Sequence, residues 1–277
     1  MTDAVHANGG RIFAQIMHGG RVSHPDTTGM RPVGPSAVPG VGDAFTPTGP
    51  QPLPTPRALD TAEVAEHAQS YARAAGRAVD AGFDGVELHG ANGYLISQFL
   101  SSNANLRTDR YGGPVANRIR FAVEAVEAVA ATVDAVGAAR TGIRFSPGGT
   151  FWGIEESDTV ELYTALLTEL ARLEVAYVHL EATVDEEALL TLRRAWPGTL
   201  VINPSVPMGP KQTGRDDADH WLALGAELVS FGRALIANPD LVERLRGGLP
   251  IAPVDAASYY QGGDAAYLTY PAHQYSA

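Results

Sequence analysis

Short apolar runs alternate with longer segments of helical periodicity along this chain, and that alternation restricts the fold more than any other feature. Each run is preceded by a segment rich in Ala, Leu and Glu. Consecutive strands that are joined through a helix run parallel, so the sequence predicts an α/β fold of repeated strand–helix units. The runs lie at residues 11–16, 85–88, 142–145, 176–180, 199–202 and 227–231.

Two parallel α/β architectures are possible, an open doubly wound sheet and a closed (β/α)8 TIM barrel. No Gly-x-Gly-x-x-Gly motif follows an apolar run, so the dinucleotide fingerprint of the open sheet is missing. Polar residues instead lie at the carboxyl ends of several different runs, at Gln15, His89, Arg144 and Gly232-Arg233. A site assembled from several strand ends is typical of the barrel, which we therefore predict.

About six of the eight barrel strands are evident in the sequence. Residues 2–7 read as the end of a helix that two glycines close, so we expect one barrel domain over residues 1–277 that is N-terminally incomplete. A long helix is expected to begin after Asp60, which forms a capping box with Glu63. Residues 19–57 are rich in Gly and Pro, and we expect them to form a loop over the mouth of the site.

Composition narrows the range of partners. The chain has 277 residues, of which 45% are apolar, and its formal net charge is −11 with no run of Lys or Arg. Nucleic acid and anionic membranes are therefore poor candidates, and a small molecule is the better one. The absence of cysteine and of an apolar leader predicts a soluble, cytoplasmic protein. His18, His24 and His179 lack a partner at metal-ligand spacing, so no metal site is predicted.

A cluster of hydrogen-bonding side chains follows the run at residues 85–88. His89, Asn92 and Tyr94 stand within six residues of one another, directly after a strand that we expect to be buried and apolar. A lone histidine at such a place is more often structural than catalytic. The functional interpretation therefore depends on the whole motif and on the other motifs that accompany it along the chain.

The sequence resembles the Old Yellow Enzyme family of flavin-dependent ene-reductases, especially its bacterial alkene and N-ethylmaleimide reductases. This resemblance implies a TIM barrel, FMN as cofactor, NADPH or NADH as reductant, and an activated alkene such as an enone, a maleimide or a nitroalkene as substrate. Members typically carry a further N-terminal segment of roughly 80 residues, which is consistent with the two barrel strands not evident in this sequence. The segments that carry the resemblance are FAQIMHGGRVSHP, ELHGANGYLISQFLSSNANLRTDRYGGPVANRIRF, GIRFSP, ELVSFGRALIANPDLVERLRGGLPI and YYQGGDAAYLTYP.

The resemblance assigns the cluster after the strand to catalysis. His89 and Asn92 match the pair that donates hydrogen bonds to the carbonyl or nitro oxygen of the alkene, and two such donors stabilise the enolate-like charge that develops there. Tyr94 matches the residue that gives a proton to the α-carbon. A phenol remains protonated at neutral pH and can therefore act as this acid. Packing beneath the cofactor is the alternative role for Tyr94.

Other residues match positions that bind FMN in the family. Gln15 matches the glutamine at the pyrimidine edge, and Arg144 matches the arginine that stabilises the anionic reduced flavin. An arginine inside a barrel is costly unless an anion pairs with it, which supports the assignment. Gly232 and Arg233 match the phosphate site. The chain has Pro204 where the family often has a glycine or asparagine, so Ser205 is expected to replace the missing N–H contact.

The expected substrate pocket is lined by Met17, Phe151 and Tyr260. Met17 stands where several members carry a tryptophan, and its flexible thioether predicts a roomier pocket. Tyr259 replaces Tyr260 if the alignment shifts by one position. The resemblance also leaves a homo-oligomer possible.

Two alternative functions stay open at this point. A barrel without its first two strands has open edges, and the first alternative is a non-catalytic chain that binds flavin poorly. The second is a (β/α)8 enzyme of another class that uses His89 as a general base.

Overall fold

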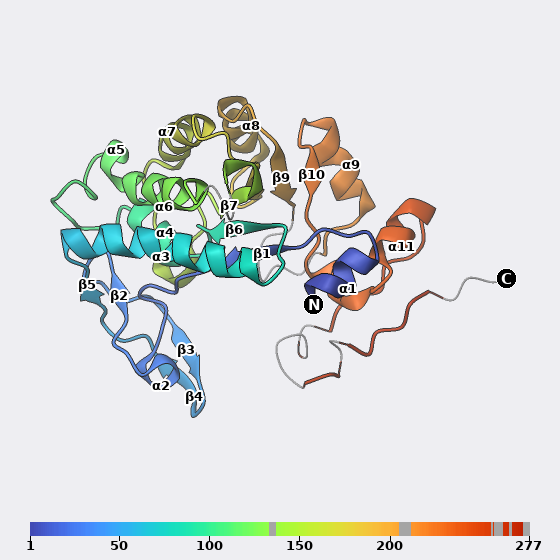
Figure 1. Cartoon of the computed structure of the whole chain (residues 1–277), viewed down its shortest axis with the longest axis horizontal. Helices are drawn as coiled ribbons and strands as arrows, with labels where there is room; N and C mark the ends of the chain where they lie inside the picture. Colours follow the sequence, from blue (N-terminus) through green and yellow to red (C-terminus); the bar gives the residue numbers. More distant parts are fainter. Residues whose placement is uncertain (133–136, 205–211, 256, 258–262, 266–267, 274–277) are drawn as a thin grey trace. The chain divides into compact units, whose positions relative to one another are not determined.

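A computed structural model describes residues 1–132, 137–204, 212–255, 257, 263–265 and 268–273. The chain divides into two compact units, Met1–Leu200 and Val201–Ala277. Figure 1 shows the course of both units, each of which is described here by itself. The expectation of a single domain over residues 1–277 stays a prediction.

The core of the first unit is a set of four parallel strands in the order β1, β6, β7, β8. In the second unit, β10 (Leu228–Val229) pairs in parallel with β9 (Leu200–Asn203). Every apolar run predicted as a strand forms one, and the parallel arrangement is confirmed. The four strands are β1 (Phe13–Ile16), β6 (Gly85–His89), β7 (Thr141–Phe145) and β8 (Tyr177–Glu181).

Helices pack on one face of these strands. Helix α3 (Thr61–Asp80) lies against β1 and β6, and α6 (Arg120–Ala130) lies against β7. The capping box of Asp60 and Glu63 is present at the start of α3, as predicted. The remaining helices of the first unit are α1 (Thr2–Ala7), α2 (Pro25–Thr28), α4 (Leu95–Leu100), α5 (Val115–Arg118), η1 (Ala138–Arg140), η2 (Phe151–Gly153), α7 (Thr159–Ala171) and α8 (Glu186–Ala195).

The described part of the second unit contains three helices besides its strand pair. They are α9 (Arg215–Ala223), α10 (Arg233–Ala237) and α11 (Leu241–Gly247). Among the described residues of the chain, no helix combines the length and the apolar character needed to cross a membrane.

The Gly/Pro-rich loop at residues 19–57 contains more regular structure than the sequence predicts. Strands β3 (Asp43–Thr46) and β4 (Gly49–Pro52) form an antiparallel hairpin, and β2 (Val33–Gly34) pairs in parallel with β5 (Arg57–Ala58). Prolines are tolerated here because each strand has a free edge. The buried guanidinium of Arg21 holds the loop in place through the carbonyls of residues 38, 152 and 153.

The two faces of the four strands differ completely in character. On the helix-covered face, Val86, Ile143 and Val178 are fully buried. On the opposite face, the rings of Phe13 and Tyr177 pack with centroids 5.9 Å apart and fill the space above two glycines. A Cβ at either glycine would lie 2.6 Å or less from an aromatic ring, so this apolar floor requires the glycines. Polar side chains follow on the same face, toward the carboxyl ends of the strands.

Candidate active site

The carboxyl ends of β1, β6, β7 and β8 carry a continuous layer of polar side chains. Strand register places Gln15 opposite Glu87, and Arg144 opposite both His89 and His179. Side chains two positions apart on a strand share a face, so these groups all point away from the helices. The predicted residues Gln15, His89 and Arg144 are thus brought together within the first unit.

The loop after β6 aims the remaining side chains of the predicted motif. Asn92 has a φ of 57° and Gly93 a φ of 76°, so the chain turns sharply through two left-handed residues. The backbone N–H of Asn92 donates to Ser146 Oγ at 2.8 Å, which ties the loop to the end of β7. A Cβ at Gly93 would lie 2.6 Å from the carbonyl oxygen of Phe151. The turn therefore has little freedom, and Phe151 lies next to it.

His89 is a buried, neutral imidazole. Burial, together with the positive charge of Arg144, lowers the pKa of His89 to about 4. Its Nδ1 is buried and has no hydrogen-bond partner among the described residues. The ring centroids of His89 and Tyr94 are 5.2 Å apart. A neutral imidazole with an unused nitrogen, beside a phenol, can donate or accept one further hydrogen bond.

The amide of Asn92 is oriented by a carboxylate that the sequence reading missed. Asn92 Nδ2 donates to Glu181 Oε1 at 3.1 Å, while Asn92 Oδ1 is buried without a partner among the described residues. Glu181 itself is fully buried at the end of β8. One amide hydrogen of Asn92 is engaged, and the second stays available to a ligand.

Arg144 is paired inside the protein. Its Nε donates to Glu181 Oε1 at 2.9 Å, its Nη2 donates to the same oxygen, and its Nη1 lies 3.2 Å from His179 Nε2. Glu181 therefore compensates the buried charge of this arginine. The burial of Arg144 does not by itself require a bound flavin. These contacts use three of the five guanidinium N–H groups and leave two for an acceptor.

A second buried carboxylate continues the network. His179 Nδ1 lies 3.0 Å from Glu87 Oε2, and Gln15 Nε2 donates to Glu87 Oε1 at 2.6 Å. Burial lowers the pKa of His179, and hydrogen bonds from His179 and Gln15 outweigh burial to lower the pKa of Glu87. His179 is thus neutral, with its proton on Nδ1 facing the carboxylate and its Nε2 accepting from Arg144.

Glu87, His179 and Glu181 were not predicted as site residues. Glu87 was assigned to an apolar strand, and His179 was considered only as a metal ligand. The overlooked signal is periodicity, since GVELH and YVHLE both place polar residues at alternate positions of a strand whose other face is apolar. Among the described residues, no group of three or more His, Cys, Asp or Glu is arranged to hold a metal ion.

The residues predicted for the substrate pocket and the phosphate site lie in several parts of the chain. Met17 follows β1 and is 53% exposed, which suits a residue at the edge of a pocket. Gly232 is the N-cap of α10, and Arg233 is the first residue of that helix. Ser205, Tyr259 and Tyr260 lie outside the described residues. The phosphate and pocket roles of all these residues stay predictions.

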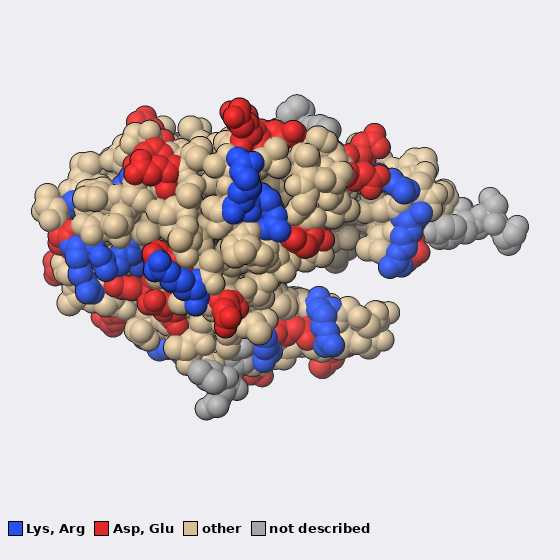
Figure 2. Space-filling view, turned by 90° about the horizontal axis from the view of Figure 1, so that it is seen from above, with Lys and Arg blue, Asp and Glu red and all other residues tan. Residues whose placement is uncertain are grey.

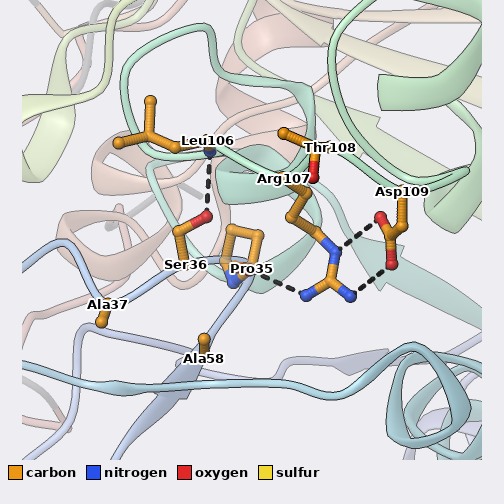
Figure 3. A pocket seen from close by; sticks show the side chains of 8 residues that line it. All are labelled: Pro35, Ser36, Ala37, Ala58, Leu106, Arg107, Thr108 and Asp109. Carbon is orange, nitrogen blue, oxygen red and sulfur yellow. Dashed lines mark hydrogen bonds and ion pairs between the residues drawn. The ribbon is translucent and has the colours of Figure 1, made fainter.

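A separate hollow of about 330 Å³ lies between the loop at residues 19–57 and residues 106–109 (Figure 3). Arg107 forms a two-pronged ion pair with Asp109, at 2.6 and 2.9 Å, and also donates to the carbonyl of Pro35. The N–H of Leu106 donates to Ser36 Oγ at 2.9 Å. The polar groups here bond to one another, so the hollow is a structural junction between two loops.

The surface bears charges of both signs. On the face shown in Figure 2, acidic and basic side chains lie interspersed over the described part of the chain. The described part of this face therefore provides no broad field of one sign to steer a polyion.

Comparison with known proteins identifies the family. Residues 1–251 match the NADH:flavin oxidoreductase / NADH oxidase family. The chain belongs to this family. A probable flavin mononucleotide-dependent alkene reductase of Leishmania infantum is 38% identical over 98% of the chain and 75% of its own length. Morphinone reductase in complex with tetrahydroNAD matches with a TM-score of 0.88 at 38% identity, over 99% of this chain and 76% of its own.

A second solved structure extends this result to the Old Yellow Enzymes. The old yellow enzyme homologue from Zymomonas mobilis matches with a TM-score of 0.88 at 34% identity, over 98% of this chain and 76% of its own. The predicted TIM-barrel class is confirmed. The protein is an FMN-dependent NAD(P)H oxidoreductase of the ene-reductase type.

The polar layer of the first unit fits one edge of an FMN isoalloxazine. The pyrimidine edge presents both hydrogen-bond acceptors and an N–H donor, and the exposed amide of Gln15 can serve both kinds of group. Arg144 retains two N–H groups for an acceptor oxygen. The unpartnered buried atoms of His89 and Asn92 lie at the same strand ends and are suited to a polar ligand.

Proposed function

We propose that this oxidoreductase reduces the C=C bond of small activated alkenes such as enones, maleimides and nitroalkenes. When bound, FMN supplies the hydride that it has received from NADPH or NADH. Gln15 and Arg144 hold the pyrimidine edge of the flavin, and Gly232, Arg233 and Ser205 hold its phosphate. Met17, Phe151 and Tyr260 line the substrate pocket.

His89 and Asn92 orient and polarise the substrate. Because His89 is neutral over the physiological range, it can donate a hydrogen bond to a carbonyl or nitro oxygen without adding a full positive charge. The free amide hydrogen of Asn92 is the second donor. Two donors aimed at one oxygen stabilise the negative charge that develops on it as the β-carbon is reduced.

Tyr94 then gives its phenolic proton to the α-carbon. The observation that carries this proposal is the compact arrangement of the neutral imidazole of His89, with its unpartnered Nδ1, and the ring of Tyr94 5.2 Å away. This proximity supports the proposal that His89 and Tyr94 act on one small substrate.

The test is the Tyr94→Phe variant, which removes the proton donor and keeps the ring. In rapid mixing of the NADPH-reduced protein with N-ethylmaleimide, we expect the rate of reoxidation to fall by about 10²- to 10⁴-fold, the usual contribution of a general acid. Reduction by NADPH should be nearly unchanged, and it serves as the internal control. An unchanged rate with the alkene would show that Tyr94 only packs in the site.

A further inference from the structure

We propose that Glu181 is a positioning residue that couples the cofactor side of the site to the substrate side. This inference rests on the proposed function, and it concerns a carboxylate that touches neither ligand. A single oxygen, Glu181 Oε1, accepts from Arg144 Nε at 2.9 Å and from Asn92 Nδ2 at 3.1 Å, in addition to Arg144 Nη2. The predicted flavin ligand and the predicted substrate ligand thus share one acceptor.

Burial makes this arrangement strong. Glu181 is fully buried, and its second oxygen, Oε2, has no partner among the described residues. A buried carboxylate with one unused oxygen relies on its remaining contacts for stabilisation, so it holds them firmly. Hydrogen bonds to an ionised acceptor are also stronger than neutral ones.

Glu181 determines which end of the Asn92 amide faces the ligand. The oxygen and nitrogen ends of an amide have nearly the same shape, but only the nitrogen end can donate to a carboxylate. The negative charge therefore selects the orientation in which Nδ2 lies near Oε1 and its second hydrogen remains for the substrate. A neutral glutamine at position 181 is a weaker acceptor, so the Asn92 amide is held less firmly in this orientation and the donor is lost part of the time.

Glu181 also moderates the charge of Arg144. Glu87, the other buried carboxylate, contacts His179 and Gln15, so Glu181 is the carboxylate bonded to Arg144 in the described structure. The ion pair with Glu181 partly neutralises the positive charge of Arg144. Removing the negative charge leaves Arg144 freer to stabilise the anionic reduced flavin, which favours the reduced state.

The experiment compares Glu181→Gln with the wild-type protein and with Glu156→Gln. Glu156 is the control, because it is a partly buried carboxylate that bonds to Tyr163 and the N–H of Gly148 and to no member of this network. In Glu181→Gln, we expect reduced FMN to bind about tenfold more tightly relative to oxidised FMN, which corresponds to a two-electron potential about 30 mV higher. The KM for N-ethylmaleimide should rise several-fold, while Glu156→Gln changes neither quantity.

A second variant separates charge from geometry. Glu181→Asp keeps the negative charge but moves it away from Asn92 and Arg144, because the side chain is shorter. The KM for N-ethylmaleimide should therefore rise, while the two-electron potential of the flavin stays nearer to that of the wild type. This variant also provides the test if Glu181→Gln does not fold. A potential and a KM that are the same in all variants would overturn the inference while the proposed function stands. Failure of the wild-type protein to bind FMN or to reduce N-ethylmaleimide would overturn both.

Discussion

The two faces of the strands in the first unit are built from alternate residues of the same segments, yet different forces hold them. Most of the helix-covered face is apolar, and Val86, Ile143 and Val178 on it are fully buried. Its stability comes from the removal of apolar area from water, which is non-directional and tolerates small changes. The opposite face carries a hydrogen-bonded network of charged and neutral polar groups in which each member depends on its partners. The members of this network are Gln15, Glu87, Asn92, Arg144, His179 and Glu181.

Neighbouring residues on β7 make the contrast concrete. Ile143 is fully buried among apolar side chains, whereas Arg144 lies between Glu181 and His179. Removing part of Ile143 leaves a small cavity. Removing the charge of Arg144 leaves two buried carboxylates, Glu87 and Glu181, without the cation between them. Burial of an uncompensated charge costs far more than a missing methyl group, so the two faces should respond unequally to substitution.

The largest effect is expected for Arg144→Leu, which keeps an apolar stem and deletes the charge. The variant should lose about 3–5 kcal/mol of unfolding free energy, as measured by urea denaturation at neutral pH, because Glu181 stays buried without its cation. Part of this loss should return at low pH, where the carboxylates take up protons. A variant as stable as the wild type would mean that the network adds nothing to folding.

A smaller effect is expected when the neutral histidines are forced to ionise. The pKa values of His89 and His18 are lowered from 6.5 to about 4, first by burial and second by Arg144 beside His89 and by His67 beside His18. Their contribution to stability is therefore complete above pH 6.5 and is lost as the pH falls from 6.5 through 4, because the unfolded chain binds more protons there. Urea denaturation across this range should show the decline.

The histidine contribution can be isolated with a variant. In His89→Asn, the slope of stability against pH between 6.5 and 4 should be shallower, since one titrating group has been removed. A slope equal to that of the wild type would show that His89 ionises as easily in the folded protein as in the unfolded one.

The smallest effect is expected on the apolar face. Ile143→Val removes one methylene from the core and should cost about 1 kcal/mol of unfolding free energy. FMN binding and the reaction with N-ethylmaleimide should be unchanged, because the polar face is intact. An activity loss comparable to that of Tyr94→Phe would show that the two faces are not independent.

Most of the fold could be predicted from the sequence, because it depends on local pattern. Apolar runs, a capping box and breaker residues are local patterns that extend over a few positions. The six strands and helix α3 form where these patterns predict them. The loop at residues 19–57 was predicted less well. Its short strands depend on pairing partners and on the distant anchor between Arg21 and the carbonyls of η2, which no local pattern specifies.

The site could be predicted only in part, for a similar reason. Five site residues could be predicted because they lie at or just after the carboxyl ends of apolar runs and match family motifs: Gln15, His89, Asn92, Tyr94 and Arg144. Their supporting groups sit inside strands, where a polar residue looks like an interruption until the register is known. The pairing of His179 with Arg144 and of Gln15 with Glu87 emerges only when β1, β6, β7 and β8 lie side by side.

The measurement that tests the central claim most directly is a visible absorption spectrum of the purified chain with added FMN. NADPH is added anaerobically, and N-ethylmaleimide follows. The account predicts a protein-bound flavin band that bleaches with NADPH and returns in full with the alkene. A band that is not retained by the protein, or that bleaches and does not return, would contradict the proposal that the polar face of these strands is an alkene-reducing site.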